Sequence, residues 1–164
     1  MADIKIKADG QKFKFRVCGL VKNGDKVLVQ KIMNNPFYCL PGGHVELGED
    51  TKTAVNREIT EEIGNPIKNE ELFAIIENFF DGTEDEQYHE LGFYYKAELN
   101  SEMETKDYVI IENDKGVEKR LEYKWVDKES IKEIDFRPVV LKPLLFEDGE
   151  KVEHFIINTR KNSK

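Results

Sequence analysis

The stretch from Leu40 to Gly64 reads LPGGHVELGEDTKTAVNREITEEIG, and the rest of the chain is organised around it. A Pro-Gly-Gly turn leads into a segment with helical periodicity. Glu58, Glu61 and Glu62 are spaced by three and four residues, so a helix places their carboxylates on one face. Like charges at these spacings destabilise a helix by a few tenths of a kcal/mol per pair. Three such acids therefore indicate either a bound cation or a fully solvated surface.

The apolar residues of the same segment favour the cation. Val55, Ile59 and Ile63 recur every four residues, about 100° around the helix from Glu58. This spacing predicts that one side of the helix is anchored in a core. The acidic side then faces a site rather than open solvent.

Both ends of the helix carry recognisable signals. Asp50 is the predicted N-cap, although Thr53 at the third helical position does not complete a capping box. Gly64, followed by Pro66, predicts the end of the helix. Together these signals predict a helix of about 14 residues.

The spacing of glycines and charges in this stretch resembles the signature of the Nudix hydrolases. Gly43 is followed after five residues by Glu49, and after seven more by the run Arg57 to Gly64. Every fixed glycine and charged position of the signature is filled. The aliphatic residue that usually follows its last glycine is Asn65 here, which predicts a weaker packing contact at the end of the helix. The resemblance implies a Nudix-like α/β/α sandwich with a mixed β-sheet between helices.

The resemblance also implies a metal site. Glu61 and Glu62 are the expected principal ligands, and Glu58 is expected to be either a ligand or the base that activates water. The carbonyl of Gly43 is a further candidate ligand. The expected catalytic residues are Glu49, Arg57, Glu58, Glu61 and Glu62.

Two arginine roles are expected around this site. Arg57 and Glu49 should form an ion pair that orients the helix, because the forked donors of a guanidinium hold a carboxylate in one plane. Arg16 and Arg137 are candidates for phosphate contacts.

The acidic face is typical of a magnesium site. Mg²⁺ prefers oxygen ligands and is usually held by one or two carboxylates together with substrate phosphates, and Mn²⁺ can take the same ligands. Zn²⁺ would require histidine or cysteine ligands, which the segment lacks in any suitable spacing. A divalent ion here would bind a diphosphate and lower the pKa of an attacking water. The sequence therefore predicts hydrolysis of a pyrophosphate bond. The resemblance implies that the substrate is a small-molecule nucleotide, a nucleoside diphosphate linked to another moiety.

Two alternatives remain open at this point. One is a nucleotide-binding or regulatory module that keeps the fold without turnover, and the intact glutamates count against it. The other is an RNA 5′-end pyrophosphohydrolase. The formal net charge of −8 argues against nucleic acid as a partner, because broad phosphate contacts need a basic surface.

Residues outside the signature offer a further acid or base. In the resembled family, an acidic or histidine side chain from another loop often assists catalysis. Glu102, Glu104 and Glu112 compete for that role, and the spacing does not decide among them. His89 lies in a predicted strand without a partner histidine, which favours an ordinary strand residue over a site residue.

Length and composition predict one domain that spans residues 1–164. Its 164 residues are 39% hydrophobic and 10% aromatic, which is enough for a proper core. Cys18 and Cys39 are far apart and lack metal-ligand spacing, so buried free thiols in a reducing compartment are expected. Residues 1–12 contain no apolar run, so neither a signal peptide nor a membrane span is predicted, and the expected location is cytoplasmic. The sequence does not predict an oligomeric state, and it is compatible with a homodimer.

The remaining elements are predicted from periodicity and turn signals. A hairpin turn is expected at Asn23-Gly24, with both residues at positive φ. Residues 100–119 are expected to be polar and interrupted, with a turn at 114–116. A helix from Pro138 to Phe146, distorted by Pro143, should cover the sheet face opposite the signature helix. Extended segments are predicted at residues 13–21, 27–32, 72–80, 88–99, 121–126 and 152–157.

Overall fold

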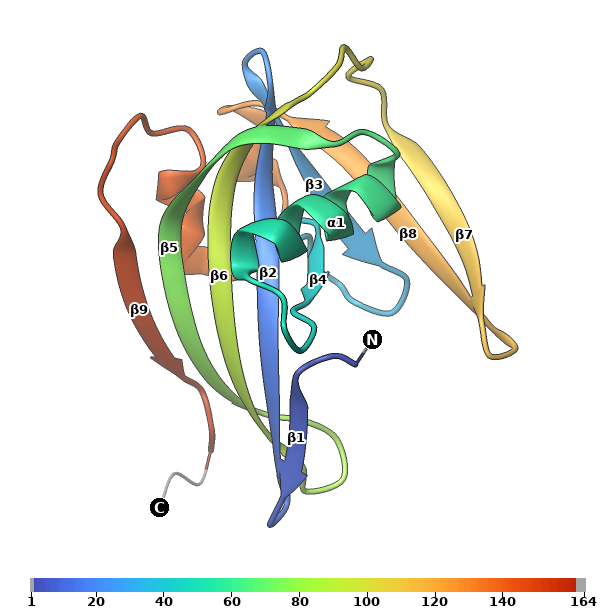
Figure 1. Ribbon diagram of the computed structural model, residues 1–164, viewed down its shortest axis with the longest axis vertical. Helices are drawn as coiled ribbons and strands as arrows, with labels where there is room; N and C mark the ends of the chain where they lie inside the picture. The colour runs from blue at the N-terminus through green and yellow to red at the C-terminus, as the bar shows by residue number, and fades with distance from the viewer. Residues whose placement is uncertain (1, 162–164) are drawn as a thin grey trace.

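A computed structural model of the protein describes residues 2–161. The chain forms a mixed β-sheet with the helix α1 (Thr51–Ile63) on one face and the short 3₁₀ helices η1 (Ser130–Glu133) and η2 (Val139–Leu144) on the other (Figure 1). The strands are β1 (Lys5–Ala8), β2 (Gln11–Asn23), β3 (Lys26–Ile32), β4 (Gly42–His44), β5 (Ile67–Asp81), β6 (Gln87–Leu99), β7 (Tyr108–Asp114), β8 (Val117–Val126) and β9 (Glu153–Asn158).

The strand order is β7-β8-β3-β2-β6-β5-β9, and both β1 and β4 pair with β2. The pairs β2–β6 and β5–β9 are parallel, and the others are antiparallel, which makes the sheet mixed. The predicted extended segments 72–80 and 88–99 form β5 and β6, which pair antiparallel. The predicted segment 152–157 forms most of β9, which lies at one end of this order.

The hairpin of β2 and β3 opens soon after its turn, and the strand that contains the signature glycines lies in the opening. Strands β2 and β3 pair at only two positions next to the turn. Beyond these, Cys39 exchanges two backbone hydrogen bonds of 2.8 Å with Gln30 on the β3 side. On the other side, β4 pairs with β2 and places Gly43 opposite Val17. The Pro-Gly-Gly turn is therefore built into the sheet directly beneath α1 (Figure 1).

The two faces of the sheet carry separate apolar clusters, which β2 supplies by alternation. Val17 packs with Val55 and Ile59 of α1, and all three are fully buried. Leu20 points to the other face and packs with Leu141 of η2. The predicted layered arrangement is confirmed, with the signature helix anchored by the expected apolar residues.

The layer opposite α1 differs from the predicted helix. It is the six-residue 3₁₀ helix η2 rather than an α-helix from Pro138 to Phe146. Pro143 lies inside it and has no N–H to donate, so the turn tightens instead of continuing as an α-helix. The apolar side chains still reach the sheet, because Leu141 and Leu145 are fully buried.

Three strands and one turn residue were not predicted correctly. Strand β4 forms where only a Pro-Gly-Gly turn was expected. Strand β1 forms within residues 1–12, and β7 forms within the segment expected to be interrupted. Strand β7 is stabilised by a tight turn in which Lys115 and Gly116 both have positive φ, next to β8. At the predicted turn between β2 and β3 only Gly24 has positive φ, while Asn23 is the last residue of β2. Among the residues that the structure describes, no helix is both long and apolar enough to cross a membrane.

Candidate active site

Helix α1 begins and ends where the sequence predicts. The Asp50 carboxylate accepts hydrogen bonds from the backbone N–H of Thr53 at 2.9 Å and from its hydroxyl at 2.7 Å. At the other end, Gly64 has a φ of 71° and its N–H donates to the carbonyl of Thr60 at 2.9 Å. These caps fix the register of every side chain that α1 presents.

Asn65, the residue that departs from the signature, makes polar contacts where an aliphatic side chain would pack. Its amide Nδ2 donates to the carbonyl of Ser101 at 3.0 Å, and its Oδ1 accepts from the Ser101 hydroxyl at 3.0 Å. The side chain is buried, and both ends of its amide are satisfied. Two hydrogen bonds thus replace the packing contact and tie the end of α1 to the segment after β6.

Arg57 forms the ion pair that the sequence predicts with Glu49. Its Nε and Nη2 donate to the two Glu49 oxygens at 2.8 and 2.9 Å, in a bidentate arrangement. Its remaining donors reach the carbonyl of His44 at 3.0 Å and Glu58 Oε1 at 2.9 Å. The hydrogen bonds from Arg57 hold the pKa of Glu49 below its usual value. This one guanidinium therefore joins β4, the loop before α1 and the acidic face of α1.

Glu58 lies directly against the backbone of Gly43. A Cβ atom at position 43 would collide with the Glu58 carboxylate, so only glycine leaves room for it. Burial raises the pKa of Glu58, and the hydrogen bond from Arg57 opposes that shift. The carboxylate is thus held between a guanidinium on one side and bare backbone on the other.

Glu62 is the most perturbed acid of the site. Burial, followed by repulsion from Glu58, raises its pKa to about 8. Its Oε2 is buried and has no hydrogen-bond partner among residues 2–161, and the same is true of the hydroxyls of Tyr108 and Tyr123. The two tyrosine rings stack at 4.7 Å, and the Glu62 charge adds to the burial that raises the pKa of Tyr108 to about 12. Buried polar atoms almost always have partners, so these three mark a place for water, an ion or a ligand.

Glu61 completes the acidic face at its outer edge. Its side chain is 61% exposed, against 17% for Glu58, and it lies 3.6 Å from Arg57 Nη1. In the described part of the chain, no group of three histidine, cysteine or acidic residues is arranged to hold a metal unaided. The donor set still fits Mg²⁺, because that ion is typically held by one or two carboxylates and completed by substrate phosphates. The Oε2 atom of Glu62, which has no hydrogen-bond partner among the described residues, is the best candidate ligand atom for Mg²⁺.

Of the three glutamates that competed outside the signature, Glu112 lies nearest the acidic face. It is on β7 with the same strand parity as Tyr108, and its charge adds to the raised pKa values of Glu62 and Tyr123. Glu102 and Glu104 lie on an exposed segment without regular structure. The sequence analysis missed both tyrosines. The available signal was the alternation of residues 121–126, which placed Tyr123 on the buried side of its strand.

Three further candidate site residues, His89, Arg137 and Arg16, differ in their distance from the signature and in their contacts. His89 packs between aromatic rings, with centroid distances of 4.4 Å to Phe79 and 5.1 Å to Phe13, as an ordinary strand residue would. Arg137 is exposed and pairs with Asp135 at 2.9 Å, so its donors are committed outside the acidic face. Arg16 lies opposite His44 in the β2–β4 pairing, and its charge lowers the pKa of Glu62. Of the two arginines, only Arg16 lies near the signature.

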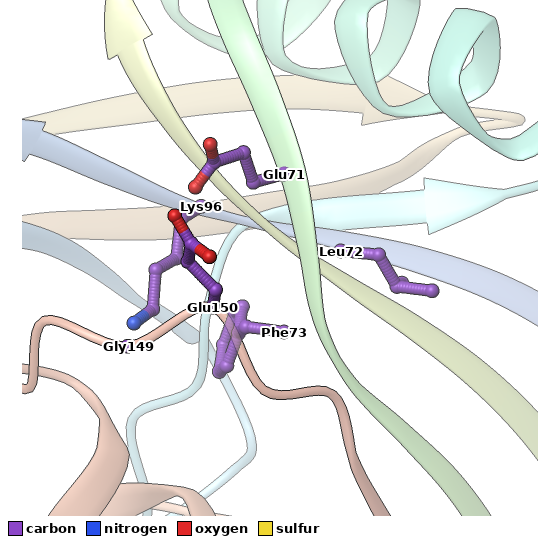
Figure 2. A pocket seen from close by; sticks show the side chains of 6 residues that line it. All are labelled: Glu71, Leu72, Phe73, Lys96, Gly149 and Glu150. Atoms are coloured by element: carbon purple, nitrogen blue, oxygen red, sulfur yellow. The ribbon is translucent and has the colours of Figure 1, made fainter.

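Two hollows on the surface do not have the three glutamates among their lining residues. Figure 2 shows one of about 300 Å³, where Lys96 and Glu71 face the segment that contains Gly149 and Glu150. Lys96 Nζ there donates a hydrogen bond of 2.7 Å to the Glu147 carbonyl. The other, of about 690 Å³, runs along the first turns of α1 and is lined by Asp50, Lys52, Thr53, Asn56, Arg57 and Glu70. Neither hollow gathers the carboxylates, so the candidate site is the acidic face itself.

Comparisons with known proteins agree with this geometry. A segment of 51 residues is 49% identical to the ADP-ribose pyrophosphatase of Methanocaldococcus jannaschii, and it covers 29% of this chain and 30% of that protein. The match thus spans about a third of the length of this relative.

Solved structures show the same fold over most of the chain. The mutator MutT protein of Bacillus halodurans superposes with a TM-score of 0.64 at 20% identity, covering 89% of this chain and 91% of that one. A NUDIX hydrolase of Nitrosomonas europaea superposes with a TM-score of 0.60 at 21% identity, covering 89% and 79%. Residues 12–145, well over half of the sequence, match the NUDIX domain. The chain therefore belongs to the Nudix hydrolase family.

Proposed function

We propose that this hydrolase uses Mg²⁺, or Mn²⁺ in its place, to cleave the pyrophosphate bond of a nucleoside diphosphate linked to another moiety. One observation carries the proposal. A buried carboxylate oxygen of Glu62 has no partner among the described residues and lies in a row with Glu58, next to the exposed Glu61. A buried carboxylate oxygen without a hydrogen-bond partner is suited to bind a cation.

The signature residues would divide the work as follows. Glu61 and Glu62 are the proposed principal metal ligands, supported by the carbonyl of Gly43. The ion would spread the charge that develops on the phosphate oxygens and lower the pKa of its bound water. Glu62 has a raised pKa and must release a proton when it takes a cation. Glu58 is a further ligand or the base that accepts a proton from the attacking water.

Residues around this set hold it in place. Arg57 occupies Glu58 Oε1 and leaves Oε2 free for a proton or a cation. Glu49 fixes the guanidinium, and so acts through Arg57 rather than on substrate. Glu112 is the proposed assisting acid from outside the signature, because its charge reaches Glu62.

The first substrate to test is ADP-ribose, because the relative with 49% local identity is an ADP-ribose pyrophosphatase. The free thiols of Cys18 and Cys39 support a reducing, cytoplasmic location. A homodimer remains compatible with the single chain described here.

The test is a panel of ADP-ribose, dinucleoside polyphosphates, nucleotide sugars, NADH and modified nucleoside triphosphates, assayed with magnesium for released phosphate products. Glu61→Gln or Glu62→Gln should lower turnover at least about a hundredfold with the fold retained, since charge stabilisation worth several kcal/mol is lost. Glu133→Gln, on the exposed part of η1, is the control and should leave turnover unchanged. Near-normal turnover in both site variants would mean that the metal binds at another site.

A second measurement separates metal binding from turnover. Magnesium should raise the melting temperature of the wild type by an amount that grows with the logarithm of its concentration above Kd. The double variant Glu61→Gln with Glu62→Gln should lose that increment. An equally strong response in the double variant would show that the acidic face is an ordinary solvated surface.

A further inference from the structure

A segment without regular structure joins β6 to β7 and passes the end of α1. We call residues 100–107 the strap. Within it Met103 alone is more than slightly buried, and its side chain packs against the apolar cluster on the α1 side of the sheet. The course of the strap therefore depends on a few hydrogen bonds rather than on a core of its own.

The two residues that follow the C-cap of α1 hold the beginning of the strap. Asn65 Nδ2 donates to the carbonyl of Ser101 at 3.0 Å, and its Oδ1 accepts from the Ser101 hydroxyl at 3.0 Å. The N–H of Asn100 donates to the carbonyl of Pro66 at 2.8 Å. Asn65 is only 7% exposed, so water competes little for its amide. Three hydrogen bonds thus fix the strap to the end of the helix that carries the acidic face.

The rest of the strap is held by the sheet. Asn23 Nδ2, at the turn between β2 and β3, donates to the carbonyl of Met103 at 2.7 Å. Asp107 Oδ1 accepts from the backbone N–H of Trp125 on β8 at 3.0 Å. Strand β7 begins at the next residue and itself pairs with β8. These contacts tie β7 to the sheet but not to α1.

The far end of the strap leads back to the acidic face. Tyr108, the first residue of β7, packs against the apolar cluster on the α1 side of the sheet. Its hydroxyl is buried without a partner among the described residues, and it lies near enough to Glu62 to feel that charge. Glu112, four residues further along β7, has the same strand parity. The strap therefore starts at Asn65, three residues beyond Glu62, and ends at a residue that interacts with Glu62.

We infer that Asn65 is a positioning residue for the candidate active site. By holding Ser101, it fixes the start of β7 relative to the end of α1. Tyr108 and Glu112 are thereby kept beside Glu62. The inference rests on the proposed function, because it concerns the surroundings of a proposed metal ligand. An aliphatic side chain at position 65 packs without directional contacts, so it would leave the strap free to shift.

Hydrogen exchange measures this anchoring without turnover. Asn65→Leu should raise the exchange rate of the β7 amides that bond to β8 at least about tenfold, because one net hydrogen bond changes an opening equilibrium about fivefold and two are lost. Ser101→Ala removes only one of the two and should raise the rate about fivefold.

Thr60→Val is the matched control for the exchange measurement. It removes a hydrogen bond of 2.7 Å between Thr60 and the Asn56 carbonyl within α1, away from the strap. It should change β7 exchange less than about twofold. Unchanged exchange in both Asn65→Leu and Ser101→Ala, or an equal effect of the control, would overturn the inference.

A double-mutant cycle tests whether the placement of β7 matters for turnover. With magnesium and the nucleotide that is hydrolysed fastest, Glu112→Gln should lower kcat of the wild type at least about tenfold, as loss of an assisting acid or base does. In the Asn65→Leu background the same substitution should lower kcat less than about threefold, because Glu112 is already displaced. In the Thr60→Val background it should keep its full effect.

The outcomes of the cycle separate a positioning role from a structural one. An undiminished effect of Glu112→Gln in the Asn65→Leu background would make Asn65 merely structural and would overturn the inference. A Glu112→Gln variant as active as the wild type would overturn it as well. If hydrogen exchange responds as expected but no nucleotide is hydrolysed, the proposed function fails and the anchoring of β7 by Asn65 stands.

Discussion

Replacement of Glu62 by glutamine should stabilise the metal-free protein at neutral pH. In the folded chain the pKa of this carboxyl is about 8, against an ordinary value of 4.5, because it is buried and next to Glu58. A raised pKa means that the group contributes most to stability below about pH 4.5, where folded and unfolded chains are both protonated. The contribution is lost as pH rises through the folded value of about 8. Glutamine, which cannot ionise, removes this pH dependence.

The magnitude follows from the size of the shift. From about pH 4.5 to about pH 7, the unfolded chain loses the Glu62 proton while the folded chain keeps it, at about 1.4 kcal/mol per pH unit. The wild type therefore loses about 3 kcal/mol relative to Glu62→Gln over this range. Near pH 4.5 the two proteins should be almost equally stable.

The assay is urea unfolding in EDTA at several pH values between about 4.5 and 8.5, with the free energy of unfolding extrapolated to water. Glu133→Gln is the control, since this exposed acid should leave the pH profile of the wild type unchanged. Parallel pH profiles for the wild type and Glu62→Gln would refute the reasoning. They would mean that water reaches Glu62 and that its burial does not raise its pKa.

Three further substitutions test the neighbouring contacts. Arg57→Lys should destabilise the fold by at least about 1.5 kcal/mol and lower activity, because an ammonium cannot hold Glu49 in a bidentate pair. A double-mutant cycle between Arg57 and Glu49 should find a coupling free energy above about 0.5 kcal/mol, and additive effects would exclude the pair. Gly43→Ala should cost about 1–3 kcal/mol in thermal unfolding and reduce turnover, because its Cβ displaces Glu58; full activity would contradict the contact. Tyr108→Phe should leave the stability of the metal-free protein unchanged or raise it, since the lost hydroxyl has no partner among the described residues, and a loss above about 1 kcal/mol in urea unfolding would show that the hydroxyl is satisfied in solution.

Elements whose signals are local could be predicted from the amino-acid sequence. The length of α1 follows from Asp50 and Gly64, and the common side of its glutamates follows from helical spacing alone. The ion pair of Glu49 with Arg57 could also be predicted, because the two residues are only eight positions apart and Arg57 lies on the helix. Interactions of this kind depend on the geometry of one element, so periodicity and caps are sufficient to predict them.

The surroundings of the acidic face depend on contacts between segments that are far apart in the sequence. Strand β7 lies in a segment that looks polar and irregular in sequence, and it brings Tyr108 and Glu112 near enough to Glu62 for their charges to interact. Its pairing with β8 depends on a turn far from the signature. Burial depth, which separates Glu62 from the exposed Glu61, depends likewise on which distant strands stack against the helix. Helical spacing sets the direction of a side chain, whereas its pKa depends on desolvation by non-local neighbours. The candidate site residues could therefore be predicted from the sequence, whereas the pKa of each carboxyl depends on packing.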